Sequence, residues 1–349
     1  MGDVVENREW YLAAYCPEGV PTSEHLKFRT VSLSIASDSI PHNHLAVETL
    51  LLSVDPYLRG RLTGTLEGLF ISQYQLNQVI TVFGVVRVIR SKDSKYNEGD
   101  ILLNRSAPVA EYSIVPSSDI ARKIDATIGI SLSDYLGSLG IPGFAAWVGI
   151  EVLGKPKVGS NVFISAASGA VGINAGQLAK IRGCRVIGST GSDDKVKLIK
   201  EEFGYDDGFN YNSESDFDAA LTKYFPDGID VYLDNVGGKM LEAVLNHVNK
   251  YARIPLCGMI SQYNKVWTER EGVRNLLNMV GKEVRMEGFM LESYWHRFGD
   301  FAKDMERYIQ EGKVKSKNKI NIGIESFLES LNSLFSSSNI GKVVVQVKA

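Results

Sequence analysis

Residues 161–172 read NVFISAASGAVG, and this stretch indicates the fold of the chain. It begins with the apolar run 162–164, which is typical of a buried parallel strand. A turn of small residues follows, and the chain continues into the apolar pattern of a helix. Ala167, Gly169 and Gly172 occupy the three glycine positions of a G-x-G-x-x-G dinucleotide fingerprint, with alanine at the first. Alone, such a turn is equally compatible with an ordinary strand-to-helix connection.

The residues after this turn alternate between strand-like and helix-like segments, the pattern of a doubly wound parallel sheet. Together with the first run, the expected strands are 185–189, 208–211, 229–238 with its loop, 253–259 and 284–289. Helices are expected over 195–202, 217–224, 300–310 and 327–335. Six strands match a complete Rossmann domain and favour the dinucleotide interpretation of the turn. Gly169 would then let the backbone approach a pyrophosphate, and Gly172 would let the helix pack closely on the strand.

The residues up to about 128 predict a second, β-rich domain with the pattern of a small, partly open barrel. Its strand-like runs are 10–13, 26–29, 46–51, 79–89 and 101–103, a compact turn covers 54–61, and a final strand is expected at 342–347. Gly84 suggests a bend in the longest run, and a helical segment with glycines follows at 135–147. A chain of 349 residues is long for one core. We expect a β-rich substrate domain of residues 1–130 and 310–349 and a Rossmann domain of residues 131–309.

Composition excludes several classes of protein. Hydrophobic residues make up 44% and charged residues 23%, as in globular domains, and the net charge of −3 argues against a nucleic-acid or anionic-membrane partner. No apolar run approaches the ~20 residues that span a bilayer, and the acidic N-terminus is no signal peptide, so a cytoplasmic protein is expected. Cys16, Cys184 and Cys257 are far apart in sequence, which excludes a four-cysteine zinc site. The pair His42 and His44 lies in a polar loop, and we expect no metal there.

The end of the second strand indicates which nicotinamide cofactor would bind. Enzymes that use NAD usually have Asp or Glu at that end, to bind the ribose 2′-hydroxyl. Here the segment 187–192 reads IGSTGS and has no acid. Asp193 lies past the turn, where it would begin the next helix. Lys195 can reach a 2′-phosphate, with the hydroxyls of Ser189 and Ser192 nearby, so NADPH is favoured, although Lys195 could instead be a solvated helix lysine.

Several motifs resemble the zinc-independent medium-chain dehydrogenases/reductases. The similarity is greatest to plant NADPH-dependent 2-alkenal (double-bond) reductases and to the leukotriene B4 12-hydroxydehydrogenase/prostaglandin reductase group. The matching stretches are VDPYLR (54–59), LGIPGFA (139–145), SAASGAVG (165–172), GSTGSDDK (188–195), FPDGIDVYLDNVGG (225–238), CGMISQYN (257–264), MEGF (286–289) and NIGK (339–342). They cover almost the whole chain, and CGMISQYN with DNVGG is far more specific than the glycine turn.

The resemblance implies an α/β fold with a Rossmann domain and a GroES-like, barrel-like substrate domain, usually as a homodimer. It implies NADPH/NADP+ as the cofactor, bound by Ala167, Ser168, Gly169, Ala170, Val171, Gly172, Gly191, Lys195, Tyr211, Asn235, Cys257, Tyr263, Phe289, Met290, Leu291 and Asn339. Lys195 and Tyr211 would bracket the 2′-phosphate. Tyr57 and Phe289 would help to form the substrate pocket.

The implied reaction moves a hydride from the nicotinamide to the β-carbon of an α,β-unsaturated aldehyde or ketone. Negative charge then develops on the carbonyl oxygen, and a hydrogen-bond donor aimed at that oxygen lowers the barrier. Tyr263 follows the fifth strand at its carboxyl end, where ligands bind in this fold. Its hydroxyl is the best candidate donor, although the ring could simply pack on the cofactor. The α-carbon proton could come from water.

Two stretches depart from the family's usual sequence, and both lie in the expected substrate domain. A Pro-Gly pair is replaced by YQLNQ at 74–78, and a tryptophan with paired glutamates is replaced at 106–111, where Glu111 alone remains. The motifs therefore predict the cofactor and the hydride chemistry and not a particular substrate. Aromatic residues that could line a pocket for a flat enone are Tyr57, Phe70, Tyr74, Tyr294 and Trp295, although ordinary packing explains each of them more readily.

The leading hypothesis is an NADPH-dependent enal/enone reductase, an oxidoreductase acting on a CH–CH group. A second is an NADP-dependent allylic alcohol dehydrogenase or a quinone reductase that uses the same site. A third, non-enzymatic hypothesis is an NADPH-binding protein without turnover, because the substrate domain is altered.

Overall fold

The structure is a computed structural model that describes residues 3–65, 72–336 and 338–348. The described chain forms two compact units. The first unit contains the residues up to 136 together with 318–339 and the residues from 343 onward, and the second contains residues 137–317 and 340–342. Each unit has its own sheet and its own hydrophobic core.

The second unit is built on a six-stranded parallel sheet with the order β10-β9-β8-β11-β12-β13. In chain order this is 3-2-1-4-5-6, so the predicted Rossmann arrangement is confirmed. The strands are β8 (Asn161–Ile164), β9 (Arg185–Thr190), β10 (Asp207–Asn210), β11 (Ile229–Leu233), β12 (Val248–Leu256) and β13 (Arg285–Gly288).

The fifth strand of this sheet differs from its prediction at both ends. Strand β12 begins five residues before the expected Arg253 and stops at Leu256. The amides of Cys257 and Gly258 both donate to the carbonyl oxygen of Asp234, at 2.8 and 3.1 Å. These bonds turn the chain out of the sheet, and Cys257 therefore lies in a loop and not in the strand.

Seven α-helices in the described part of the second unit accompany the sheet. They are α1 (Ile141–Trp147), α2 (Ala170–Ile181), α3 (Asp193–Phe203), α4 (Phe217–Tyr224), α5 (Gly238–His247), α6 (Leu277–Lys282) and α7 (Phe298–Gln310). The prediction for α4 is confirmed at both ends, whereas α5 and α6 were not anticipated from the sequence. The expected helical segment 135–147 is divided: a 3-10 turn ends at Tyr135, and α1 begins at Ile141. The carbonyl of Ser138 packs against Gly143, where it leaves no room for a Cβ.

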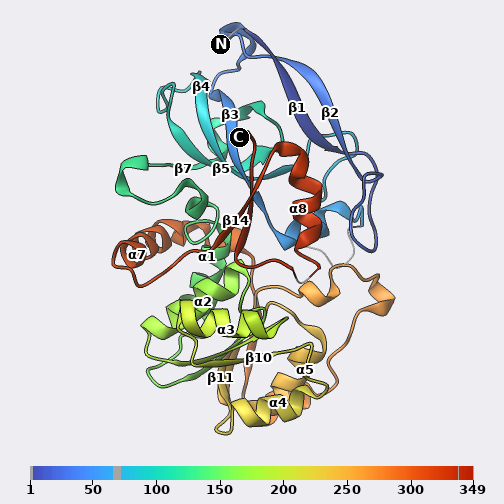
Figure 1. Ribbon diagram of the computed structural model, residues 1–349, viewed down its shortest axis with the longest axis vertical. Coiled ribbons are helices and arrows are strands. Elements are labelled where there is room, and N and C mark those ends of the chain that lie inside the picture. Colours follow the sequence, from blue (N-terminus) through green and yellow to red (C-terminus); the bar gives the residue numbers. More distant parts are fainter. Residues whose placement is uncertain (1–2, 66–71, 337, 349) are drawn as a thin grey trace. The chain divides into compact units, whose positions relative to one another are not determined.

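Alternating side chains on β11 show how both faces of the sheet are covered. Tyr232 belongs to a core cluster with residues of α4 and α5, and its ring stacks on Phe163 with centroids 5.0 Å apart. Figure 1 shows α4 and α5 next to each other in this unit. On the opposite side, Leu233 contacts Gly149 so closely that a Cβ there would lie 2.5 Å from its Cδ1. The segment Val148–Gly154 therefore covers the second face.

The first unit holds an antiparallel sheet with the order β14-β15-β3-β4-β5-β7, in which β6 also pairs with β3. Its strands are β3 (His44–Val54), β4 (Thr81–Ser91), β5 (Ile101–Pro108), β6 (Tyr112–Pro116), β7 (Ile120–Lys123), β14 (Asn318–Ile322) and β15 (Lys342–Gln346). A separate pair is formed by β1 (Val4–Leu12) and β2 (Leu26–Ser34). Within the described residues the sheet does not close into a barrel. A register shift between β4 and β5 falls between Val82 and Gly84, where the sequence predicted a bend.

The core of the first unit joins segments from the two ends of the chain. Helix α8 (Phe327–Ser333) buries Phe327 and Leu331 in the same cluster as Trp10 and Val343. The indole nitrogen of Trp10 donates to the carbonyl oxygen of Ile324 at 2.8 Å. Within the described residues, no helix combines the length and the apolar character that crossing a bilayer requires.

Candidate functional site

Most of the predicted site residues follow the carboxyl ends of the parallel strands in the second unit. Parallel strands end at the same edge of a sheet, so the loops that carry these residues share one edge. After β8 come Ala167, Ser168, Gly169, Ala170, Val171 and Gly172; after β9, Gly191 and Lys195; after β10, Tyr211; after β11, Asn235; after β12, Cys257 and Tyr263; after β13, Phe289, Met290 and Leu291.

The turn between β8 and α2 is shaped by its glycines. Gly169 is the N-cap of α2, and its amide donates to the carbonyl oxygen of Ala166 at 3.0 Å. A Cβ at Gly172 would lie 2.5 Å from that same oxygen, so the expected close packing of helix and turn requires glycine there. Among the described residues, no side chain caps the start of α2. Its first amides can therefore hydrogen-bond an anion.

Alanine fits the first fingerprint position because the neighbouring strand has a glycine. Ala167 is fully buried, and a Cβ added to Gly188 of β9 would lie 2.5 Å from the Ala167 Cβ. The Ala167 side chain is therefore accommodated because Gly188, its neighbour on β9, has no side chain. The amide of Ala167 donates to the carbonyl oxygen of Ser189 at 2.9 Å, and so it is used within the fold.

Gly191 and Lys195 follow β9, and Tyr211, which follows β10, contacts Gly191. The Tyr211 hydroxyl lies 2.9 Å from the position that a Cβ of Gly191 would take, which leaves room for no larger residue. Ser192 caps α3 and accepts from the Lys195 amide at 3.3 Å. The Lys195 side chain is mostly buried, and burial lowers its pKa. A phosphate beside the ammonium would offset that effect.

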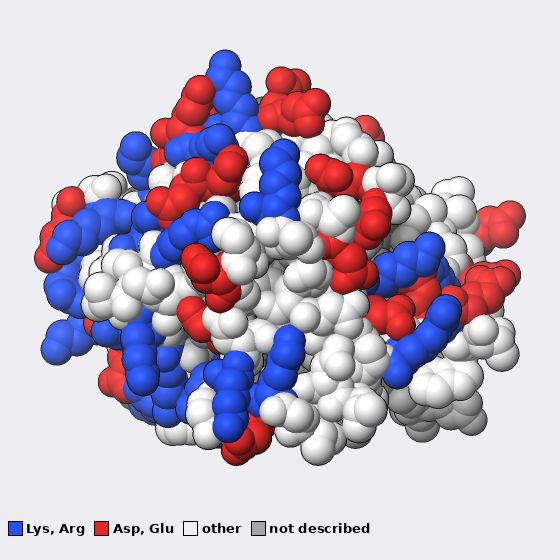
Figure 2. All heavy atoms as spheres, turned by 90° about the horizontal axis from the view of Figure 1, so that it is seen from below, with Lys and Arg blue, Asp and Glu red and all other residues white. Residues whose placement is uncertain are grey.

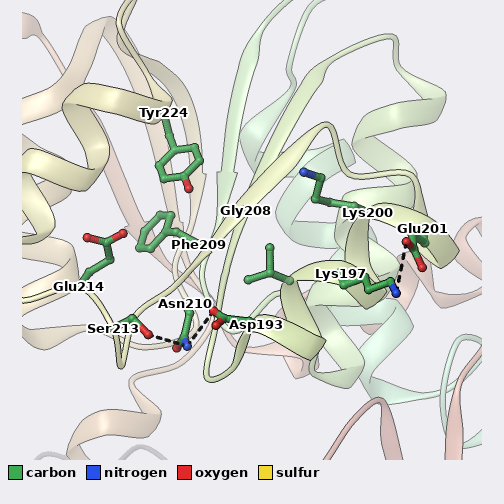
Figure 3. Close-up of a pocket in the computed structure, with 11 residues that line it drawn as sticks. Asp193, Lys197, Lys200, Glu201, Gly208, Phe209, Asn210, Ser213, Glu214 and Tyr224 are labelled. Carbon is green, nitrogen blue, oxygen red and sulfur yellow. Dashed lines mark hydrogen bonds and ion pairs between the residues drawn. The ribbon is translucent and has the colours of Figure 1, made fainter.

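Two polar residues near this loop differ in their roles. Asp193 is the first residue of α3 and accepts from the Asn210 amide nitrogen at 3.1 Å (Figure 3), which agrees with its expected place at a helix start. Ser189, expected beside the 2′-phosphate, is 1% exposed, and its hydroxyl has no hydrogen-bond partner among the described residues. Ser189 is the last but one residue of β9, before the turn begins.

The loop after β11 is organised by the buried carboxylate of Asp234. Its Oδ1 accepts from the amides of Val236 and Gly237, at 2.9 and 2.8 Å, and from the Tyr232 hydroxyl at 2.7 Å. Burial raises the pKa of Asp234 despite these bonds. The predicted site residue Asn235 donates through its side chain to the carbonyl oxygen of Ser165 at 2.8 Å. Asp234 and Ser165 thus connect the loops after β8 and β11, a role that the sequence did not reveal.

Tyr263 lies in the loop after β12, directly after a short 3-10 turn (Ile260–Gln262). Its hydroxyl oxygen accepts from the amide of Met259 at 3.2 Å and lies 2.8 Å from the position of a Cβ on Gly258. Burial raises the pKa of Tyr263 to about 12, so the hydroxyl keeps its proton at neutral pH. The described residues offer no acceptor for that proton, and Tyr263 can therefore donate it to a ligand.

Cys257 lies beside the same loop. Burial, with the nearby Asp234 carboxylate, raises the pKa of the Cys257 thiol to about 12. The thiol is therefore neutral at physiological pH and is a weak nucleophile.

The remaining predicted site residues lie on other segments of the chain. The rings of Phe289 and Tyr294 meet edge to face with centroids 6.3 Å apart, and Met290 is 39% exposed. Asn339 and Tyr57 belong to the first unit, where Tyr57 packs against the core. The amide of Gly341, two residues after Asn339, donates to the carbonyl oxygen of Ser168 at 2.8 Å.

Three other aromatic residues proposed for the pocket have separate outcomes. Tyr74 is 6% exposed, and its hydroxyl bonds to the carbonyl of Thr81, so its place is in the core. Trp295 stacks on Phe298 with centroids 4.5 Å apart. Phe70 lies outside the described residues.

A surface cavity of about 420 Å³ lies beside α3 and β10 (Figure 3). It is lined by Asp193, Val196, Lys197, Lys200, Glu201, Gly208, Phe209, Asn210, Ser213, Glu214 and Tyr224. None of these was a predicted cofactor contact. Lys200 pairs with Asp207 at 2.8 Å, and Lys197 with Glu201 at 3.9 Å. The two lysines that line the cavity are therefore paired with carboxylates of the protein.

Charges of both signs are interspersed on the face drawn in Figure 2. Among the residues that the structure describes, no group of three or more His, Cys, Asp or Glu side chains is arranged to hold a metal ion.

Comparison with known proteins supports one family over the whole chain. Residues 170–309 match the family described as "Zinc-binding dehydrogenase", and residues 8–122 match "N-terminal domain of oxidoreductase". The chain is 42% identical over 349 residues to a 2-alkenal reductase (NADP(+)-dependent) of Nicotiana tabacum, with 99% of each chain covered. It is 39% identical over 344 residues to (+)-pulegone reductase of Mentha piperita, again with 99% of each covered.

A solved structure shows the same fold. The crystal structure of CurA from Vibrio vulnificus in complex with NADPH has a TM-score of 0.87 and 32% sequence identity. The match covers 98% of this chain and 99% of that one.

Proposed function

This chain belongs to the medium-chain dehydrogenase/reductase family, and on that premise we propose that it is an NADPH-dependent reductase of activated C=C bonds. The observation that carries the proposal is the 42% identity, over nearly the full length of both chains, to an NADP-dependent 2-alkenal reductase. The substrates proposed are α,β-unsaturated aldehydes and ketones. Pulegone reductase, the second relative, is also named for a reductase activity, which supports the same class of reaction.

The residues after β9 and β10 fit the phosphate that distinguishes NADPH from NADH. Gly191 leaves space beside the Tyr211 hydroxyl, and Lys195 is a cation in the first turn of α3. No acidic side chain occupies the end of β9, and Asp193 is bonded to Asn210. We assign the 2′-phosphate to Lys195 and Tyr211, and the pyrophosphate to the turn 167–172. When bound, NADPH supplies the hydride.

Tyr263 is proposed as the donor to the substrate carbonyl oxygen. Its hydroxyl accepts one bond from the Met259 amide, which orients the oxygen and leaves the proton available. Because its pKa is raised to about 12, the group donates a hydrogen bond at neutral pH without ionising. A preorganised donor of this kind contributes on the order of 10²–10³ in kcat. Tyr57 and Phe289 are proposed as pocket residues.

The division of labour between domains remains a proposal. We assign substrate recognition to residues 1–130 and 310–349 and nucleotide binding to residues 131–309. A homodimer is also proposed, because β13 is an edge strand of the parallel sheet and the segment before it in sequence exposes the apolar side chains of Leu276, Leu277 and Val280. Sedimentation would test the dimer, and subcellular fractionation would test the cytoplasmic location.

The function is tested by following NADPH consumption with a panel of enals, enones and quinones and identifying each product. A saturated aldehyde or ketone is expected. An allylic alcohol would show that the carbonyl, and not the C=C bond, is reduced, and turnover of quinones alone would favour a quinone reductase. NADPH binding without turnover across the panel would favour the non-enzymatic alternative.

A further inference from the structure

The loop that carries Tyr263 is long and folds over the start of α5. We call residues 257–271 the Tyr263 segment. Its first half is fixed to the loop after β11: the Ile260 amide donates to the carbonyl oxygen of Asn235 at 3.1 Å, and the Ser261 hydroxyl donates to that of Val236 at 2.6 Å. Tyr263 comes after these bonds, so its own position depends on how the rest of the segment is held.

The second half is held by the carboxylate of Glu271. Its Oε2 accepts from the amide of Lys239, in the first turn of α5, at 3.2 Å and from the side chain of Gln262 at 3.3 Å. Its Oε1 accepts from the Lys265 ammonium at 3.1 Å. The Glu271 amide donates in turn to the Gln262 Oε1 at 2.9 Å. Gln262 and Lys265 lie on either side of Tyr263 in sequence. The bonds to Glu271 therefore hold the chain both before and after Tyr263.

Two glycines at the start of α5 make this approach possible. A Cβ at Gly238 would overlap the Glu271 carboxylate, and a Cβ at Gly237 would lie 2.8 Å from the Met259 Cγ. Both residues have positive φ, at +70° for Gly237 and +55° for Gly238, which favours glycine. A carboxylate beside the first amides of a helix is also electrostatically favourable.

The charge on Glu271 is retained at neutral pH. Burial alone would raise the pKa of the Glu271 carboxyl, but the hydrogen bonds from Lys265 and from the Lys239 amide outweigh it and hold the pKa below its ordinary value. The carboxylate is thus ionised where it meets the helix start and Lys265.

We propose that Glu271 is a positioning residue for the reaction, which clamps the Tyr263 segment onto the N-terminus of α5 and so fixes the Tyr263 hydroxyl. This inference rests on the proposed role of Tyr263. Glu271 itself touches no reacting atom and acts through Gln262 and Lys265. A donor displaced by about 1 Å can cost about 100-fold in rate, and the clamp therefore affects turnover more than cofactor affinity.

The test compares Glu271→Ala, Glu271→Gln and the control Glu269→Gln in the full-length protein. Hydrogen–deuterium exchange of residues 257–271, without cofactor, measures the order of the segment independently of activity. Glu271→Ala should accelerate exchange there and lower kcat about 10- to 100-fold, with NADPH affinity changed less than about threefold. Glu271→Gln keeps an acceptor for the Lys239 amide and should recover kcat to within about fivefold of the wild type. Glu269, in the same segment, makes no side-chain hydrogen bond or ion pair with the described residues and should change neither quantity.

A double-mutant cycle separates this inference from the function on which it rests. If Glu271 acts through Tyr263, then Glu271→Ala should lower kcat by less than about threefold in a Tyr263→Phe background. An equal loss in both backgrounds would overturn the proposal, as would unchanged exchange or unchanged kcat in Glu271→Ala. Failure of the proposed function would appear separately, as absence of enone turnover in the wild type.

Discussion

The turn after β8 and the segment after β12 both lie at the carboxyl edge of the same sheet, but they are held in different ways. In the turn, backbone contacts decide the shape: Gly172 has no room for a Cβ, and Gly169 is the N-cap of α2. In the Tyr263 segment, side chains decide the shape. Glu271 bonds to Gln262, nine residues earlier in the chain, and to the Lys239 amide in the first turn of α5. A local glycine pattern can be recognised in a sequence, whereas a set of distant side-chain bonds cannot.

The largest expected effect is steric and belongs to the turn. Gly172→Ala would place a Cβ 2.5 Å from the Ala166 carbonyl oxygen, and the backbone there cannot easily move. We expect a loss of about 2–4 kcal/mol in the free energy of unfolding. Thermal denaturation measures it, with Gly281→Ala in α6 as the matched control. Gly281 has open space at its Cβ position, and there the change should be neutral or slightly stabilising. Equal stability of the two variants would contradict the steric account.

The next effect concerns chemistry in the segment. Tyr263→Phe removes only the hydroxyl, and kcat should fall by about 10²–10³-fold because one donor to the developing negative charge is lost. Cofactor affinity should stay within about twofold, since the ring remains. Stopped-flow measurement of NADPH oxidation with a single enone would check this. An unchanged kcat would leave the ring with a packing role only.

A smaller effect is expected from the phosphate contact after β9. Lys195→Ala should weaken NADPH binding by about 10- to 100-fold, the usual range for a lost charge-assisted hydrogen bond, and leave NADH binding almost unaltered. Fluorescence titration with both cofactors measures the ratio. Lys197→Ala is the control, because that side chain is 71% exposed on the same helix. Equal losses for NADPH and NADH would remove the phosphate role of Lys195.

The last prediction is that kcat does not fall through ionisation of Tyr263 over a range of pH. The pKa of Tyr263 is raised to about 12, so the hydroxyl keeps its proton until the pH rises through that value. The kcat profile should therefore show no fall from Tyr263 ionisation between about pH 7 and about pH 10. A fall in this range that Tyr263→Phe abolishes would mean that the hydroxyl ionises much earlier than its burial implies.

The same contrast explains how far the sequence could be interpreted. The alternation of strands and helices predicted a Rossmann sheet. The absence of an acid at the end of β9 predicted NADPH and not NADH as the cofactor. The sequence did not predict the early end of β12, because the bonds that turn Cys257 out of the sheet come from the backbone of Asp234. The place of the Ser189 hydroxyl beside the 2′-phosphate stays a prediction, since its burial at the end of β9 neither supports nor contradicts that contact.

The predictions for the candidate site depend most on positions where backbone geometry restricts the residue type, and the contacts themselves stay predictions. The six residues of the turn and the glycine beside Tyr211 belong to that class. No role was assigned to Asp234, Ser165 or Glu271 from the sequence, because an acid or a serine has many ordinary uses in a protein. The motif DNVGG contains Asp234, and its pair Gly237-Gly238 indicates a close approach without identifying the group that approaches.

The protonated state of the cysteines has a consequence for an enzyme that handles enals. Such compounds alkylate thiolates by conjugate addition at the same β-carbon that a hydride would attack. Burial raises the pKa of all three thiols, to about 12 for Cys257, to about 11 for Cys184, and upward for Cys16 as well. Because the thiol form reacts slowly, we expect conjugate addition of an enal to these three cysteines to be slow. Peptide mapping after exposure to excess enal without NADPH should find Cys257 unmodified.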